Sequence, residues 1–385
     1  MPNRFPENGI FAVVGDHPTH DLAGSTSRDL TLGELLALAD PSALAGLDLG
    51  YGSSAGSEPL RQILAADLGV PPEAVVTTTG GASLALAAIA LEAVAPGDRV
   101  VVARPSFPAA FETLVAAGLD VVPLPLAFES GYALDLDRLA DTLTPATRLV
   151  SLATPQNPSG VAIPLPTIRD ALDVLDRHAP RALLLVDETY REAVYGNAPV
   201  PPSAAALDPR ILTVASISKA HGAPGLRVGW LTAHDPALRA RLVLAKNNLV
   251  ITGSVLDEAL AAVLLQHREA ILAPRRAHLA QALDTVEAWV GDHADRLAWN
   301  RPDGGALCAV RLRPEVYGDV AVDAFWDALP ALDLRLADGS WFGESRRVAR
   351  LGFGHLPLDR LRLALDAVSA ALQAPLDGRG SLPRS

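Results

Sequence analysis

The sequence is poor in cysteine, methionine, aromatic residues and lysine. Cys308 is the only cysteine among 385 residues, which excludes an intramolecular disulfide and favours a reducing compartment, so we expect a cytoplasmic protein. Aromatic residues make up 5% of the chain and hydrophobic residues 49%, so Ala, Leu and Val must supply most of the core. This composition is typical of helices packed against an aliphatic sheet.

Positive charge is also scarce. The formal net charge is −12, and the chain lacks the clusters of Lys and Arg that binding to nucleic acid or to an anionic membrane requires. The N-terminal residues contain no apolar core of signal-peptide length. The most apolar run, residues 82–98, carries Glu92 and Asp98 and therefore predicts a buried helix rather than a membrane span. We expect neither nucleic acid nor membrane as a partner.

From about residue 58 the chain alternates between helical and strand-like segments. Short aliphatic runs lie at residues 98–105, 119–126, 147–155, 181–190, 211–218 and 226–233. This alternation predicts the α/β fold class with a large, doubly wound and mainly parallel sheet. After residue 236 the sequence is mostly helical, with strand-like stretches near its end, which predicts a smaller α+β domain. We predict an N-terminal arm with part of the small domain at residues 1–30 and the large domain at 31–255. The small domain follows at 256–373, and a flexible tail at 374–385.

Lysine occurs only at Lys219 and Lys246. An amine can lose its proton when it is desolvated or lies near cations, and it can then form an imine with an aldehyde, which a guanidinium cannot do. Lys219 lies in a serine-rich turn after an apolar run, eight residues before Arg227. Considered alone, it could be an ordinary surface lysine. Lys246 has no candidate catalytic neighbours in sequence, and we predict a solvated helix residue.

Four further side chains follow the predicted strands or lie in turns, where ligands of such sheets bind. Asp187 ends a strand and Tyr190 comes three residues later, so a carboxylate and a phenol can converge on one ring. Asn157 lies in a proline-bounded turn, and Phe107, on another, could stack on a flat heterocycle. A carboxylate that pairs with a pyridine nitrogen makes the ring an electron sink. These groups suit an aldehyde cofactor such as pyridoxal 5'-phosphate (PLP).

A phosphate site is predicted beside them. In TTTGGASLAL a glycine pair leads directly into a helix, so the amides near Gly81 and Ala82 form an anion site. Ser216 and Ser218 could add hydroxyl donors, and Arg227 a bidentate charged contact.

The order of these motifs resembles the PLP-dependent enzymes of fold type I, specifically the class I/II aminotransferase family. The matching pieces, which cover most of the chain, are YGSSAG, TTTGGAS, RPSFP, TPQNPSG, VDETY, SISKAHGAPGLRVGW and VARLGFG. The resemblance implies a seven-stranded sheet in the large domain and a Schiff base between PLP and Lys219. It also implies that Asp187 pairs with the ring nitrogen, that Asn157 and Tyr190 bond the ring hydroxyl, and that Phe107 stacks on the ring.

The same resemblance assigns the remaining site residues. The phosphate would be held by Gly81, Ala82, Ser216, Ser218 and Arg227. Arg350 would bind the α-carboxylate of the substrate, with Asn157 and Gly24 also in the substrate site and Ser25 and Arg28 near it. Tyr51 would bind the phosphate in the neighbouring subunit, which implies a homodimer.

The resemblance implies an aminotransferase that acts on an L-amino acid, with a keto acid as the second substrate. The same residues also serve elimination, cyclisation, decarboxylation and oxidation, because one carbanion can undergo any of these reactions. Residues 21–38, DLAGSTSRDLTLGELLAL, depart from the usual aminotransferase segment. They are more similar to capreomycidine synthase-like enzymes, which modify amino acids in natural-product pathways. The alternative is therefore a PLP-dependent lyase, cyclase or decarboxylating deaminase, and a bacterial secondary pathway is expected for either.

Three other interpretations are weaker. The stretch GDHPTHD, residues 15–21, has H-x-x-H spacing without a rigid frame, so we expect no metal. GYGSSAG misses the GxGxxG spacing by one residue, which argues against a dinucleotide fold. A PLP-binding regulator would carry a DNA-binding domain, and no basic helix-turn-helix segment is visible.

Overall fold

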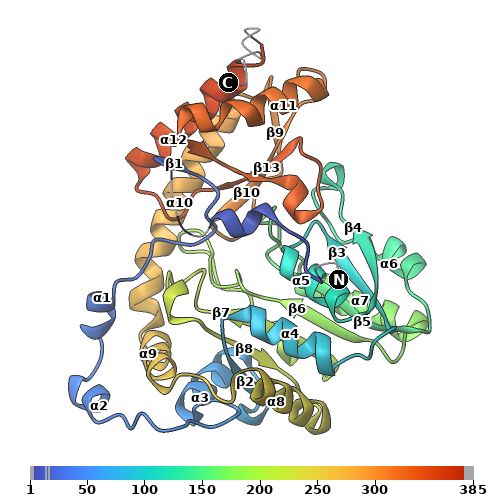
Figure 1. Cartoon of the computed structure of the whole chain (residues 1–385), viewed down its shortest axis with the longest axis vertical. Coiled ribbons are helices and arrows are strands. Elements are labelled where there is room, and N and C mark those ends of the chain that lie inside the picture. The colour runs from blue at the N-terminus through green and yellow to red at the C-terminus, as the bar shows by residue number, and fades with distance from the viewer. Residues whose placement is uncertain (1–3, 14, 16–17, 377–385) are drawn as a thin grey trace.

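The computed structural model describes residues 4–13, 15 and 18–376, and its largest element is a seven-stranded sheet (Figure 1). The strand order is β2-β8-β7-β6-β5-β3-β4, and β8 runs antiparallel to both its neighbours while the other pairs are parallel. The strands are β2 (Val75–Thr79), β3 (Arg99–Arg104), β4 (Asp120–Pro125), β5 (Thr147–Ala153), β6 (Leu183–Asp187), β7 (Ile211–Ser216) and β8 (Val228–Thr232). The predicted fold class is confirmed, and only β2 was absent from the aliphatic runs identified in the sequence.

Helices cover both faces of this sheet, which explains why most of its strands are rich in aliphatic residues. Along β3, Val100 and Val102 pack with Ile89 of α4, whereas Val101 packs on the opposite face with Ile168 of α7. One face carries α4 (Ala82–Glu92), α5 (Pro108–Ala116) and α8 (Pro236–Val250). The other carries α3 (Glu58–Leu68), α6 (Leu136–Thr142), α7 (Leu165–His178) and α9 (Val255–Gln266). The short helices α1 (Leu32–Leu36) and α2 (Pro41–Ala45) precede α3.

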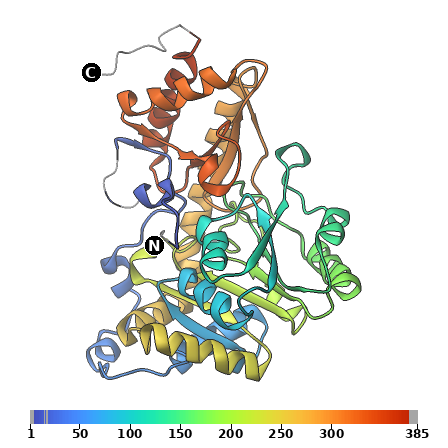
Figure 2. The same ribbon diagram turned by 45° about the vertical axis from the view of Figure 1, so that its right-hand side comes forward.

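A smaller unit follows, built on a four-stranded antiparallel sheet of order β12-β13-β10-β9. Its strands are β9 (Leu297–Trp299), β10 (Leu307–Leu312), β12 (Ala337–Asp338) and β13 (Val348–Gly352), and its helices are α10 (Arg268–Asp292), α11 (Asp319–Ala328) and α12 (Leu358–Gln373). The N-terminal arm joins it, because β1 (His20–Asp21) pairs in parallel with β11 (Leu334–Arg335). Figure 2 shows the arm, in blue, between the two units.

The hydrophobic clusters indicate where the chain passes from the large unit to the small unit. We predicted that the small domain begins at residue 256, but α9 packs on the large sheet, where Leu260 shares a cluster with Leu60 and Trp230. The buried residues of α10 belong to the small-unit core from Leu272 onward. By packing, the change of unit therefore falls in the first turn of α10, which links the two units in Figure 1. The other predicted limits stay predictions, and residues 377–385 of the predicted tail lie outside the described residues.

No helix within the described ranges is both long and apolar enough to cross a membrane. Asp16 and His17 of the GDHPTHD stretch lie outside the described residues.

Candidate active site

A cavity of about 800 Å³ lies at the carboxyl edge of the large sheet, where residues of both units and of the N-terminal arm meet. It is lined by all the predicted site residues except Tyr51: Gly24, Gly81, Ala82, Phe107, Asn157, Asp187, Tyr190, Ser216, Ser218, Lys219, Arg227 and Arg350. Residues far apart in sequence meet here because parallel strands place their carboxyl ends at one edge.

Lys219 lies in the turn after β7. Its Nζ is 3.0 Å from the Oγ of Ser25 and 5.9 Å from the centroid of the Tyr190 ring. Its carbonyl oxygen accepts a hydrogen bond of 3.1 Å from the Ser27 amide. The amine is thus directed into the cavity, within reach of a ligand that lies against Tyr190.

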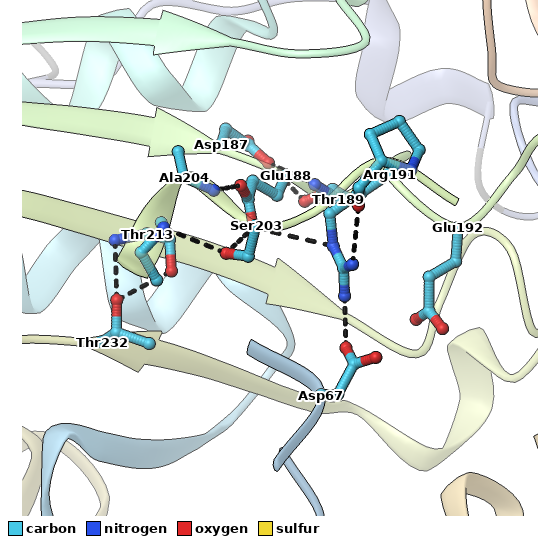
Figure 3. Close-up of polar contacts among 12 residues, drawn as sticks. Asp67, Asp187, Glu188, Thr189, Arg191, Glu192, Ser203, Ala204, Thr213 and Thr232 are labelled. Atoms are coloured by element: carbon cyan, nitrogen blue, oxygen red, sulfur yellow. Dashed lines mark hydrogen bonds and ion pairs between the residues drawn. The ribbon is translucent and has the colours of Figure 1, made fainter. Parts of the chain in front are cut away.

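Asp187 is the last residue of β6. Its Oδ1 accepts hydrogen bonds from the amide and the hydroxyl of Thr189, at 2.9 and 2.5 Å (Figure 3). Burial raises the pKa of Asp187, and the Thr189 bonds and the charge of Lys219 only partly offset that rise. No cation of the described residues forms an ion pair with this carboxylate. A protonated ring nitrogen would supply the missing positive charge.

A polar network fixes the loop that follows Asp187 (Figure 3). Glu188 accepts hydrogen bonds of 2.6 Å from the Ser203 hydroxyl and the Ala204 amide. Arg191 forms an ion pair with Asp67 of α3 and donates to the carbonyl of Pro201 at 3.0 Å. Because these buried groups satisfy one another, the loop holds Asp187 and the Tyr190 that follows in one orientation.

Tyr190 and Asn157 both line the cavity. The Tyr190 hydroxyl is buried and has no hydrogen-bond partner in the described part of the chain. Buried hydroxyls are normally paired, so a ligand that accepts this bond is expected. Asn157 already accepts a hydrogen bond of 2.9 Å through Oδ1 from Nη1 of Arg350, which leaves its amide nitrogen for a ligand.

The predicted phosphate residues converge around Gly81, which precedes the first residue of α4 and has a φ of 70°. A Cβ built on Gly81 would lie 3.6 Å from both the Cβ of Ser216 and the Oγ of Ser218, and 3.7 Å from Nη2 of Arg227. Arg227 also donates to the carbonyl of Gly80 at 2.7 Å. Two hydroxyls, a guanidinium and a helix N-terminus thus surround one point, as a phosphate requires.

Arg350 lies on β13 and is only 2% exposed. Its Nη1 bonds to Asn157 and its Nη2 donates to the Ala23 carbonyl at 2.5 Å, while the guanidinium lies 4.8 Å from the Phe342 ring centroid. Burial lowers the pKa of Arg350 to about 10, and its Nε has no partner within the described ranges. A buried guanidinium without a carboxylate partner suits the carboxylate of an amino acid.

Phe107 and Gly24 complete the predicted set. Phe107 caps the N-terminus of α5 and packs in a small cluster with Ile10 and Phe342. A Cβ on Gly24 would lie 2.8 Å from Cε1 of His355, so only glycine fits there without a shift. Arg28, expected near the pocket, does not line the cavity and pairs with Glu34 at 2.7 Å.

Several cavity residues were missed by the sequence analysis. The N-terminal arm contributes Ile10 and Val13 from the 3-10 helix η1 (Gly9–Val13), and the small unit contributes His355. No periodicity marks these residues, because they reach the cavity only when the two units pack together. Thr189 is different, since a threonine two residues after the strand-end Asp187 could have been identified as its hydrogen-bond donor.

Tyr51 and Lys246 lie away from the cavity. Tyr51 is 86% exposed and lines a separate surface hollow with Thr252, Ser254 and other residues. The expectation that Lys246 is solvated is wrong: this residue of α8 is 1% exposed, and burial lowers its pKa.

Three features fit PLP. Among the described residues the Tyr190 hydroxyl has no hydrogen-bond partner, which suits the ring oxygen, and Asp187 has no ion-pair partner, which suits the ring nitrogen. The groups around Gly81 suit the phosphate. Fold and site together therefore define a PLP-dependent enzyme of fold type I, and the cofactor of this protein is PLP. The family model of aminotransferase class I and II matches residues 29–366, so the chain belongs to that family.

Relatives of known activity fall in two groups. The chain is 34% identical over 364 residues to a capreomycidine synthase of Streptomyces vinaceus, with 93% of this chain and 91% of the relative covered. It is 31% identical over 287 residues to an arginine-pyruvate transaminase of Pseudomonas aeruginosa, with 72% and 71% covered. The structure of the PLP-dependent cyclase OrfR is similar, with a TM-score of 0.86, 25% identity and 97% and 98% covered. Aspartate aminotransferase of Thermus thermophilus shares the fold, with a TM-score of 0.85, 21% identity and 96% and 99% covered.

Proposed function

We propose that this protein is an aminotransferase that transfers the amino group of an L-amino acid through PLP carried on Lys219. The observation that supports this proposal most strongly is the convergence of the Lys219 amine, the Asp187 carboxylate and the Arg350 guanidinium on one cavity. Membership of the aminotransferase class I and II family supports it as well.

The bound cofactor supplies an aldehyde that joins to amines and a ring that withdraws electrons from the carbon attached to that nitrogen. Asp187 would keep the ring nitrogen protonated, and Tyr190 and Asn157 would donate to the ring oxygen. Phe107 would stack on the ring. The phosphate would be held by the Gly81–Ala82 amides and by three side chains: Ser216, Ser218 and Arg227.

Arg350 and Lys219 act on the substrate. Arg350 binds the α-carboxylate, and its rigid contacts to Asn157 and Ala23 fix the direction of Cα. The amine of Lys219, once free, removes the α-proton as a general base and later returns a proton. The substrate leaves as a keto acid, and a second keto acid accepts the amino group.

A second candidate is a PLP-dependent lyase, cyclase or decarboxylating deaminase that acts on an amino acid in natural-product biosynthesis. It is supported by the similarity to a capreomycidine synthase over 93% of the chain and by the likeness to the cyclase OrfR. Lys219, Asp187 and Arg350 would have the same tasks up to removal of the α-proton, and only the later steps would differ. A cytoplasmic location stays a prediction in both cases.

The proposed enzyme is a homodimer in which Tyr51 completes the phosphate site of the partner. Family members of this fold are typically dimeric. The high exposure of Tyr51, beside Thr252 and Ser254 on the surface, is what such a contact requires.

Borohydride reduction followed by peptide mapping tests the covalent role. Since the chain has only two lysines, a pyridoxyl label has two possible side-chain sites. We expect the label on Lys219 and none on Lys246, and Lys219→Ala should lose both the label and turnover. Retained turnover in Lys219→Ala would refute the assignment.

The reaction type is decided by the state of the cofactor after one turnover with a panel of L-amino acids. In transamination the cofactor ends in the amine form and a keto acid appears in equal amount. In the alternative reactions the aldehyde form of the cofactor is recovered without a keto acid as amino acceptor. Absorbance spectra and keto-acid analysis of the same sample distinguish these outcomes.

A further inference from the structure

Ser25 forms the one hydrogen bond that Nζ of Lys219 makes within the described residues, at 3.0 Å and across 194 positions of sequence. The serine is 7% exposed and lines the cavity. We propose that Ser25 is a positioning residue that holds the Lys219 amine whenever this amine is not bonded to the cofactor. The inference rests on the proposed role of Lys219 and extends it.

The segment that carries Ser25 is fixed to the large unit independently of that contact. The Ser27 amide donates to the carbonyl of Lys219 at 3.1 Å, and the Leu30 amide donates to the carbonyl of Gly222 at 2.6 Å. These bonds run to the turn that contains Lys219 itself. Ser25 therefore keeps its place relative to the amine when the cofactor leaves Nζ.

The same segment is tied to the residue that receives the substrate carboxylate in the proposed function. Arg350 donates to the carbonyl of Ala23, two positions before Ser25, and the Gly352 amide donates to the carbonyl of Leu22 at 2.7 Å. Ser25 thus lies between the group that orients Cα and the group that moves its proton. An amine held there is placed by the same segment that contacts Arg350.

A hydroxyl suits this task because it is both donor and acceptor. It can donate to a neutral amine, and it can accept from an ammonium after rotation about its C–O bond. When the α-proton passes to Nζ, the electron pair of the broken C–H bond stays on the substrate side and the lysine gains one positive charge. Ser25 can hold the nitrogen before and after this transfer, so the amine does not swing away between the two steps.

Displacement of Lys219 from the PLP-loaded protein by aminooxyacetate tests the inference without any knowledge of the natural substrate. The probe forms a C=N bond to the aldehyde carbon, the C=N bond to Lys219 breaks, and two protons pass from the aminooxy nitrogen to the lysine nitrogen. Ser25→Ala should slow this displacement about tenfold, because a hydrogen bond to the departing amine is lost. The rate is followed by stopped-flow absorbance of the cofactor.

Ser27→Ala is the matched control. Ser27 is 1% exposed, its Oγ has no hydrogen-bond partner in the described part of the chain, and its amide contact to Lys219 survives the substitution. We expect its displacement rate within about twofold of that of the unsubstituted protein, since only an unpaired hydroxyl is removed. Ser25→Thr, which keeps the hydroxyl, should recover most of the lost rate.

Equal displacement rates in Ser25→Ala and Ser27→Ala would overturn the inference, and so would failure of Ser25→Thr to recover. An equal loss of cofactor affinity or thermal stability in all three variants would point to loop packing and would also count against it. The proposed function fails in a different way, namely if borohydride places no label on Lys219 in the unsubstituted protein.

Discussion

Asp187 shows how the site is built at the scale of single residues. The protein places a carboxylate at a buried strand end and gives it hydrogen bonds from Thr189 but no ion pair within the described residues, and burial raises its pKa. The fold alone therefore disfavours the ionised form, which a protonated ring nitrogen would stabilise. Arg350 is the converse case, a buried guanidinium whose pKa is lowered to about 10. Each group is a buried charge that a ligand of opposite charge would stabilise.

This imbalance predicts opposite effects of Asp187→Asn on stability and on cofactor binding. With PLP absent, the variant should be more stable than the unsubstituted protein by about 1 kcal/mol at pH 7, because a buried charge is replaced by a neutral amide of the same shape. The advantage should shrink as the pH falls through the raised pKa of Asp187, since the carboxyl then becomes neutral in the unsubstituted protein as well. Urea unfolding of the cofactor-free proteins between pH 4 and pH 8 measures this.

In the PLP-loaded protein Asp187→Asn should be the impaired variant, because the carboxylate is then needed. An amide cannot keep the ring nitrogen protonated, so turnover should fall by about a hundredfold or more. Thr189→Val is the comparison variant, because it removes a hydrogen bond to Asp187 but keeps the carboxylate, and it should reduce turnover far less. If Asp187→Asn were destabilised and Thr189→Val equally inactive, this account of the site would be wrong.

At the scale of elements, the strand ends explain how much of the site the sequence predicts. Asp187 was identified because it ends a predicted strand, and parallel strands bring such ends together. Gly81 was identified because it precedes a helix. In each case a local pattern carries the information.

Contacts between elements could not be predicted in the same way. The contact between Ser25 and Lys219 depends on how the N-terminal arm lies across the sheet edge, which no local pattern encodes. Burial of Lys246 depends on the tertiary packing around α8, and the helix sequence around this lysine shows almost no amphipathic bias that would reveal the buried face. Sequence patterns therefore predict where an element ends better than which element covers it.

The buried amine of Lys246 carries an electrostatic cost that can be measured. Lys246 of α8 is buried, its Nζ has no hydrogen-bond partner in the described ranges, and burial lowers its pKa while the charge of Glu258 raises it. Glu258 of α9 in turn accepts from the Ser57 amide at 2.7 Å and the Thr77 hydroxyl at 2.5 Å. The carboxylate is therefore paired, whereas the amine is not.

Lys246→Met should accordingly be as stable as the unsubstituted protein or more stable by about 1 kcal/mol at pH 7, since Met fills a similar volume without a charge. A lowered lysine pKa costs stability at low pH, and this cost disappears as the pH rises through the unfolded value of 10.5. The difference in free energy of unfolding between Lys246→Met and the unsubstituted protein should therefore narrow from pH 7 to pH 10, as measured by chemical unfolding. Glu258→Gln is the contrasting variant and should lose about 2 kcal/mol, because a paired buried carboxylate is removed. A difference that does not change with pH would contradict this explanation.

At the scale of the whole molecule, the cavity exists only because two units and an arm are packed together. The large unit supplies Lys219 and Asp187, the small unit supplies Arg350, and the arm supplies Ser25. Tyr51, the remaining predicted site residue, is exposed and does not line this cavity in its own chain. A second copy of the chain is the partner that would give it a function in the proposed enzyme.

Mixed dimers test this arrangement. Tyr51→Ala and Lys219→Ala should each be nearly inactive alone, the first through weak phosphate binding and the second through loss of the amine. If Tyr51 serves the partner's site, a dimer of one subunit of each kind has one site with both residues intact and one site with neither. Random mixing makes half of the dimers mixed, so activity should return to about a quarter of the unsubstituted level.

The two variants are co-expressed with different affinity tags and purified through both tags in sequence, which isolates the mixed dimers. Turnover of this preparation should be about half that of the unsubstituted protein. Lys219→Ala paired with Asp187→Asn is the control, because both substitutions alter each subunit's own site. The control dimer has no intact site, since each chain supplies both Lys219 and Asp187 to its own site. Recovery in the Tyr51 mixture but not in the control would establish the exchange of Tyr51 between subunits, whereas inactivity of both mixtures would show that Tyr51 does not act in the partner's site.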